Sequence, residues 1–258
     1  MGKSVNRHIK ELENMKKYPK KLFFRGNLSL IDRVKVSIVG TRKPSNYTRV
    51  FTYNLAQALS KRGVCIVSGG AMGVDTLAHC GAKEDNTIMV VANGLDIYYP
   101  SLNRELIQNV EKKGLMISQF ENGFKATNWS FVVRNEIVVA LGDILIVTEC
   151  DIKSGSMRSV EYALKMGKKI YVLPHRLGES LGTMKLVEDD RAEFIYDIDR
   201  FASMFGVEVD DDIVKDDFFY FCQKSPTFEE CVKEFGARVY EAELEGIISV
   251  EDGIVRIG

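Results

Sequence analysis

Basic, glycine and serine residues gather in four short segments of the chain, and together they have the chemistry to bind phosphate groups. The segments are 40–44 (Gly-Thr-Arg-Lys-Pro), 68–70 (Ser-Gly-Gly), 131–136 (Phe-Val-Val-Arg-Asn-Glu) and 153–156 (Lys-Ser-Gly-Ser). Glycine lets the backbone approach a ligand closely, backbone N–H groups donate hydrogen bonds, and the arginine fork matches phosphate oxygens. The 68–70 loop alone is a weak signal, because its spacing is neither G-x-G-x-x-G nor a P-loop.

Short apolar runs that alternate with helical segments must position these loops. Candidate strands cover 34–39, 64–67, 87–91, 115–118, 144–148 and 170–173, and candidate helices cover 46–62, 74–83, 102–113, 131–141 and 156–166. Near-continuous apolar strands separated by helices are typical of a parallel sheet with both faces covered. The sequence therefore predicts an α/β protein with a Rossmann-like, doubly wound, mostly parallel sheet.

In such sheets, ligands bind beyond the carboxyl ends of the strands, where the strand order reverses. Segments 40–44, 68–70 and 153–156 follow the first, second and fifth candidate strands, so all three are expected at that edge. One glycine-rich loop is common in α/β proteins, whereas three that converge on one edge indicate a site for several phosphates.

The last forty residues have a pattern of their own. An apolar run at 218–223 is followed by a Ser-Pro-Thr helix cap, two short helical segments and a β-like pair with an Asp-Gly turn at 252–253. Helices followed by a hairpin predict a small winged-helix-like domain. The expected organisation is a basic N-terminal lead-in (1–33), a Rossmann-like domain (34–205), an acidic linker (206–217) and the winged-helix-like domain (218–258). A short helix is expected near 6–17.

The formal net charge of −1 conceals a strong asymmetry. Residues 1–50 contain 13 Lys or Arg against 3 Asp or Glu, whereas residues 188–258 contain 7 against 20. A basic front part indicates either a polyanionic partner or simply a solvated basic face. The acidic C-terminal part argues against a DNA grip by the winged-helix-like domain and favours a protein contact.

The five cysteines form no C-x-x-C pair and are odd in number, which is typical of buried thiols in a reducing compartment. No segment has the pattern of a signal peptide or a membrane span, so a cytoplasmic location is expected. We expect no metal, cofactor or catalytic residue. His79 and His175 lack neighbours at ligand spacing, and Asp75 at a helix start is expected to be a cap.

The order of these motifs resembles the DprA (Smf) family of DNA-processing proteins of natural transformation. The matching stretches run through residues 19–190: 36–42 (Val-Ser-Ile-Val-Gly-Thr-Arg), 67–75, 78–79, 94–100, 131–135, 154–156 and 168–174. The resemblance implies an extended Rossmann fold that binds single-stranded DNA, forms a homodimer and helps to load the RecA recombinase on incoming strands.

Residue by residue, the resemblance implies a nucleic-acid site along the predicted loops. Arg42, beside Lys43, would bind phosphate, and the backbone of Ser68, Gly69 and Gly70 would form a cradle. Phe131 would stack on a base, although without the resemblance it would be assigned to the core. Further contacts are expected from Arg134, Asn135, Ser154, Gly155 and Ser156. The family usually has arginine where this chain has Met72 and Glu136, so two cations that could contribute to DNA affinity are missing from this chain.

A rival class is a nucleotide-binding protein or phosphoribohydrolase on the same fold. Such enzymes place a glycine-rich loop and a glutamate around an N-glycosidic bond. In this chain Glu161 is the one carboxylate near the Ser154 loop that could act on such a bond, and no second carboxylate is placed to form a pair with it. The enzyme is therefore the second interpretation.

Overall fold

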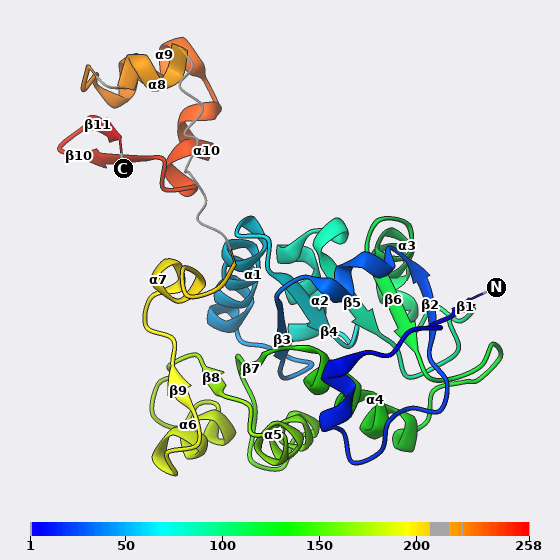
Figure 1. Ribbon diagram of the computed structural model, residues 1–258. Helices are drawn as coiled ribbons and strands as arrows, with labels where there is room; N and C mark the ends of the chain where they lie inside the picture. Colours follow the sequence, from blue (N-terminus) through cyan, green and yellow to red (C-terminus); the bar gives the residue numbers. More distant parts are fainter. Residues whose placement is uncertain (1, 207–216, 223, 258) are drawn as a thin grey trace. The chain divides into compact units, whose positions relative to one another are not determined.

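The computed structural model describes residues 2–206, 217–222 and 224–257, in two compact units that comprise residues 1–208 and 209–258. Within the described residues, the first unit contains a nine-stranded sheet in the order β1-β2-β6-β5-β4-β3-β7-β8-β9 (Figure 1). The strands are β1 (Lys3–Ser4), β2 (Phe23–Gly26), β3 (Lys35–Val39), β4 (Cys65–Ser68), β5 (Thr87–Val90), β6 (Leu115–Ser118), β7 (Ile144–Val147), β8 (Ile170–Val172) and β9 (Glu193–Phe194).

The six predicted strands form the centre of this sheet. All contacts from β6 through β9 are parallel, and only β1 and β2 run antiparallel, with β2 pairing on β6. Strands β3 to β7 are buried at every position, which matches their nearly unbroken apolar sequences. The predicted mostly parallel, doubly wound sheet is confirmed.

Helices cover both faces of the sheet (Figure 1). One core joins α1, α2 and α7 to side chains such as Ile38 and Ile66, and α3 packs on the same side over Met89 and Met116. The other core joins α4, α5 and α6 to Val39 and Val67. The helices are α1 (Asn46–Lys61), α2 (Val74–Ala82), α3 (Arg104–Lys113), α4 (Asn128–Leu141), α5 (Gly155–Lys165), α6 (Leu181–Glu188) and α7 (Ile198–Ala202).

The strand order reverses between β3 and β7. From β3 the chain winds outward through β4, β5 and β6, and then crosses through α4 to β7 on the other side of β3. The loops after β3 and β7 therefore lead to helices on opposite faces of the sheet, and they leave a crevice between them at its carboxyl edge. This is the edge where the sequence predicts a phosphate site.

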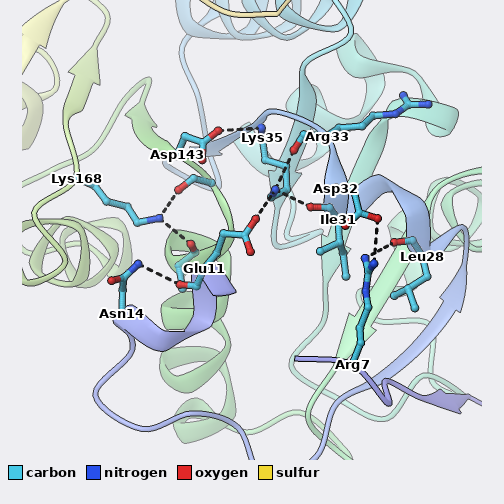
Figure 2. A network of polar contacts seen from close by, with 12 residues as sticks. Arg7, Glu11, Asn14, Leu28, Ile31, Asp32, Arg33, Lys35, Asp143 and Lys168 are labelled. Atoms are coloured by element: carbon cyan, nitrogen blue, oxygen red, sulfur yellow. Dashed lines mark hydrogen bonds and ion pairs between the residues drawn. The ribbon is translucent and has the colours of Figure 1, made fainter. Parts of the chain in front are cut away.

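The basic N-terminal segment belongs to this unit and adds β1 and β2 to the sheet. Where a short helix is expected near 6–17, it forms a 3-10 helix of five residues, η1 (Lys10–Asn14), which buries Leu12 in the core. Figure 2 shows the polar contacts that hold this segment and the start of β3. The Lys35 ammonium lies 2.7 Å from the Glu11 carboxylate and donates to the carbonyls of Ile31 and Arg33. Because Lys35 is only 3% exposed, these three oxygens replace its hydration.

Lys168 is the second lysine of this network, and it gives a pH-dependent prediction. Its ammonium donates to the carbonyls of Ala140 and Gly142 (Figure 2). Burial lowers the pKa of Lys168 from 10.5 to about 8. The charge of Lys35 lowers this pKa further, whereas the charges of Asp143 and Glu11 raise it. At pH values between the folded and the unfolded pKa, the unfolded chain binds more protons than the folded chain. The free energy of unfolding therefore rises with pH, by about 1 kcal/mol once solvent screening is included.

Urea unfolding of Lys168→Met and wild type at pH values of about 8 and 10 tests this pH dependence. We expect the variant to lose the rise, whereas Lys169→Met, a change at the exposed neighbouring lysine, keeps it. A Lys168→Met protein with the wild-type pH dependence would contradict the assignment.

The second unit is a small domain with its own core around Phe218, Cys231 and Val255. Its described elements are α8 (Asp217–Cys222), α9 (Phe228–Phe235), α10 (Arg238–Leu244), β10 (Ile248–Glu251) and β11 (Ile254–Ile257). Thr227 caps α9 as expected, and the predicted hairpin turns at Asp252 and Gly253, both with positive φ. The winged-helix assignment stays a prediction. Most of the predicted linker, residues 207–216, lies outside the described residues.

No helix within the described ranges is both long and apolar enough to cross a membrane.

Candidate nucleic-acid interface

A pocket of about 350 Å³ opens in the crevice between β3 and β7. A smaller pocket of about 50 Å³ adjoins it and shares Arg42, Gly69, Ala71 and Phe131 with it. Eight of the predicted site residues line the larger pocket, namely Arg42, Gly69, Phe131, Arg134, Asn135, Ser154, Gly155 and Ser156. The predicted convergence of segments that lie far apart in the sequence is thus present at the carboxyl edge of the sheet.

A buried ion pair forms the floor of the pocket. The Arg134 guanidinium, on α4, lies 3.8 Å from the Asp75 carboxylate in the first turn of α2 and donates to the carbonyl of Val90 at 3.1 Å. Arg134 and Asp75 are 4% and 8% exposed. Burial raises the pKa of Asp75 and lowers that of Arg134, and in each case the partner's charge opposes the shift. Nε of Arg134 is buried without a hydrogen-bond partner among the described residues.

This ion pair also fixes the glycine loop. Asp75 accepts a hydrogen bond from the backbone N–H of Ala71, and Gly69 packs directly on the guanidinium. A Cβ atom at Gly69 would come within 1.4 Å of Nη1 of Arg134 and within 2.7 Å of the Asp75 carboxylate. Glycine at 69 therefore lets the loop close over the pair without displacing either side chain. Asp75 acts as a positioning residue for the cradle.

Arg42 and Phe131 form the mouth of the pocket. The guanidinium of Arg42 lies 5.5 Å from the centre of the Phe131 ring, and that of Arg134 lies 5.9 Å from it, within the range of cation–π contacts. Tyr99, which is 50% exposed, lies 6.0 Å from the same ring. Arg42 is exposed and makes no ion pair with any residue that the structure describes. Its charge is therefore available for an anionic ligand.

Among the described helices that begin in the crevice, α5 is the one with neither a side-chain capping bond nor a carboxylate at its N-terminus. At α1, the Glu149 carboxylate accepts hydrogen bonds from the N–H and hydroxyl of Ser45. Burial alone would raise the pKa of Glu149, but these hydrogen bonds hold that pKa below its usual value. At α2 the anion is Asp75. At α5 the cap residue Ser154 makes no capping bond, and Gly155 and Ser156 line the pocket. The N–H groups of α5 are the ones left for a phosphate.

The structure separates three predicted site residues from the larger pocket. Ser68 is fully buried, and its hydroxyl donates to the carbonyl of Ile38, so its side chain faces the sheet. Gly70 lines only the smaller pocket, where its positive φ shapes the turn. Lys43 is exposed and lines neither pocket.

Sequence reasoning did not assign Tyr99 and Arg158 to the site, although both line a pocket. The sequence signal that could have found them is a polar or aromatic residue in a loop, or in the first turn of a helix, at the carboxyl edge of the sheet. The two departures from the resembled family lie in different places. Met72 is exposed and lines the smaller pocket, whereas Glu136 lines neither and accepts a hydrogen bond from the backbone of Lys16.

The pocket contains one carboxylate among its described lining residues, Asp75. Glu161, the carboxylate considered for glycosidic chemistry, is exposed outside the pocket and lies 3.6 Å from Arg158. No group of three or more metal-ligating side chains occurs in the described part of the chain. The arrangement can hold an anion and an aromatic base, and it offers no pair of carboxylates for acid–base catalysis.

Comparison with known proteins identifies the family. The family model described as DNA recombination-mediator protein A matches residues 4–206. The DNA processing protein DprA of Streptococcus pneumoniae is 34% identical over 175 residues, which are 66% of this chain and 62% of that protein. The Smf protein of Synechocystis is 34% identical over 173 residues, which are 66% of this chain but 44% of that protein. The chain thus matches less than two thirds of the length of these relatives.

Two solved structures share the fold. DNA processing protein A of Helicobacter pylori, described for its mode of single-stranded DNA binding, superposes with a TM-score of 0.77 at 41% identity, covering 78% of this chain and 94% of that one. DprA of Streptococcus pneumoniae superposes with a TM-score of 0.74 at 29% identity, covering 80% and 75%. The chain belongs to the DNA recombination-mediator protein A family, whose members include DprA and Smf.

Proposed function

We propose that this chain binds single-stranded DNA in the crevice between β3 and β7 and performs no chemistry on it. The observation that carries the proposal is Arg42, an exposed cation without an ion-pair partner among the described residues, placed over Phe131 at the mouth of a pocket. A cation next to an aromatic face matches the repeating unit of a single strand, in which a phosphate is followed by an unpaired base. The similarity to a Helicobacter pylori protein described for single-stranded DNA binding supports it.

The proposed contacts divide between backbone and base. Arg42 and the free N–H groups of Gly155 and Ser156 bind phosphate, and the Phe131 ring, with Tyr99 beside it, receives a base. The Asp75–Arg134 pair contributes no net charge, so Arg42 sets the positive sign of the pocket mouth. These contacts are independent of sequence, because every nucleotide has a phosphate and a π face.

A more specific role for this chain can be proposed from its family. We propose that the bound strand is incoming DNA in natural transformation, that the protein protects it and helps to load the RecA recombinase, and that it does so as a cytoplasmic homodimer. The acidic C-terminal unit, with exposed Glu241, Glu243 and Glu245 on and after α10, has the charge for a protein contact rather than a DNA contact.

The rival proposal, a phosphoribohydrolase, rests on the pocket volume of about 350 Å³, which fits a small ligand. No catalytic pair supports it, because Asp75 is the one carboxylate among the described lining residues and is already paired with Arg134. Incubation with nucleoside monophosphates and chromatography for the free base decides between the two, and release of base would favour the enzyme.

A salt-titrated gel shift with matched single-stranded and duplex oligonucleotides tests the proposed function. We expect tighter binding of the single strand, a steep loss of affinity with salt, and little dependence on sequence. Equal affinity for duplex, or binding that does not respond to salt, would contradict the proposal.

Phe131→Leu tests the base contact separately. Leucine keeps an apolar side chain on α4 but removes the ring, so we expect a loss of about 1 kcal/mol in affinity for single-stranded DNA with an unchanged salt slope. The measurement is fluorescence anisotropy of a labelled oligonucleotide at several salt concentrations. A change in slope without a change in affinity would show that Phe131 acts only through Arg42.

A further inference from the structure

Trp129 is the only tryptophan of the chain, and 61% of it is exposed. It stands in the first turn of α4 and packs against a pair of stacked rings, Phe120 and Phe124, whose centres are 4.3 Å apart. The indole meets these rings at centroid distances of 5.7 Å and 6.5 Å and at steep angles. The three rings form an aromatic platform that is rigid at its base and open on its outer side.

The platform is joined to the wall of the DNA pocket. The backbone N–H of Gly94 donates to the carbonyl of Phe124 at 2.9 Å, and the loop of Gly94 continues to Tyr99, which lines the smaller pocket. Trp129 also precedes Phe131 by two residues on the same helix, whose start is fixed by the Thr127–Ser130 capping box. The platform therefore lies at the same carboxyl edge of the sheet as the pocket, with Phe120 and Phe124 in the segment that follows β6.

One lysine beside the platform is free to contact a phosphate. Lys125 follows Phe124, is exposed, and makes no ion pair with any described residue. The nearby carboxylates are both engaged, since Glu121 lies 2.8 Å from the Lys21 ammonium and Asp96 accepts the N–H of Gly123 at 2.9 Å. An exposed ring beside an unpaired lysine is the composition of surfaces that stack the bases of single strands.

We propose that Trp129, backed by Phe120 and Phe124, is a second base-stacking station for the same strand, outside the pocket. The inference rests on the proposed function, because it extends the path of single-stranded DNA from Phe131 to Trp129. A strand that spans both stations contacts phosphate at Arg42 and at Lys125. A strand too short to leave the pocket does not reach Trp129.

The single indole makes its own environment measurable. Excitation at a wavelength that tyrosine does not absorb reports Trp129 alone, and stacking of a base on it is expected to quench its emission. Titration with an oligothymidylate of about 20 nucleotides should quench the emission, and one of about 4 nucleotides should bind without quenching it. Added salt should reverse the quenching together with binding.

Anisotropy of labelled DNA then separates this inference from the proposed function. Trp129→Ala should weaken binding of the long strand about tenfold, Trp129→Tyr should recover most of it, and the short strand should bind as to wild type. Tyr196→Ala, which removes an 82% exposed ring next to β9 at the opposite edge of the sheet, is the matched control and should have no effect.

Unchanged emission with the long strand, together with wild-type affinity of Trp129→Ala, would overturn the second station. If Arg42→Ala still weakens binding in that case, the proposed function stands and the platform is not a contact of the strand. If Arg42→Ala has no effect either, the proposed function itself fails. Circular dichroism of the variants shows that a lost affinity does not come from unfolding.

Discussion

Alanine at position 42 is expected to weaken binding of single-stranded DNA by about 2–3 kcal/mol, roughly 30- to 150-fold, the largest loss among the single-residue binding variants. Arg42 supplies a charge without an ion-pair partner among the described residues and lies 5.5 Å from the Phe131 ring, so its loss removes a phosphate contact and loosens the ring that receives a base. Because Arg42 is exposed, the free energy of unfolding should change little. Anisotropy with a labelled strand at fixed salt measures the effect.

The neighbouring lysine provides the matched control for Arg42. Lys43→Ala removes the same charge from the same loop, but Lys43 lines neither pocket. Arg42→Ala should lower the salt slope by about one unit, and Lys43→Ala by about one unit or less. Only Arg42→Ala should also lower the affinity strongly at all salt concentrations. Equal losses in the two variants would mean that the loop contributes general charge and that the pocket is not the site.

The central sheet was predictable because its information is local. Each of β3 to β8 is an apolar run flanked by a helical pattern, and burial on both faces demands that composition. β1, β2 and β9 were not predicted. β1 and β9 are two residues long, and β2 (Phe-Phe-Arg-Gly) becomes a strand only through its antiparallel pairing with β6, some ninety residues away.

The candidate site was predictable in its location and less so in its roles. Strand ends fix where loops converge, and eight of the predicted residues line the pocket. The role of an arginine depends on which carboxylate the fold brings to it, and that is a long-range property. Arg134 meets Asp75, Arg42 meets no described carboxylate, and Glu136 turns to the backbone of Lys16 rather than to the pocket. These partners cannot be inferred from the spacing of residues in the sequence.

Arg134 is therefore expected to act mainly on stability and on the shape of the cradle. Arg134→Met leaves the buried Asp75 carboxylate without its cationic partner, and we expect a loss of about 3 kcal/mol in the free energy of unfolding. Arg158→Met, the same change at an exposed arginine that also lines the pocket, should cost less than about 1 kcal/mol. Urea unfolding of both variants makes the comparison.

The pH dependence of the Arg134→Met loss has a definite sign. Burial already raises the pKa of Asp75, and removal of Arg134 raises it further. A carboxyl group whose folded pKa lies above its unfolded value contributes stability that is present at low pH and is lost as the pH rises through the folded pKa. The difference between Arg134→Met and wild type should therefore be smaller at a pH of about 5 than at about 8. A difference that grows toward low pH would contradict the buried pair.

Removal of both partners separates positioning from direct contact with the strand. Arg134→Met with Asp75→Asn keeps the net charge of the pocket and replaces a buried ion pair by neutral groups, so we expect most of the lost stability to return. If Arg134 only holds Gly69 and the cradle in place, the double variant binds single-stranded DNA within a few-fold of wild type. If its affinity falls as far as that of Arg42→Ala while its stability recovers, Arg134 itself contacts phosphate from the floor of the pocket.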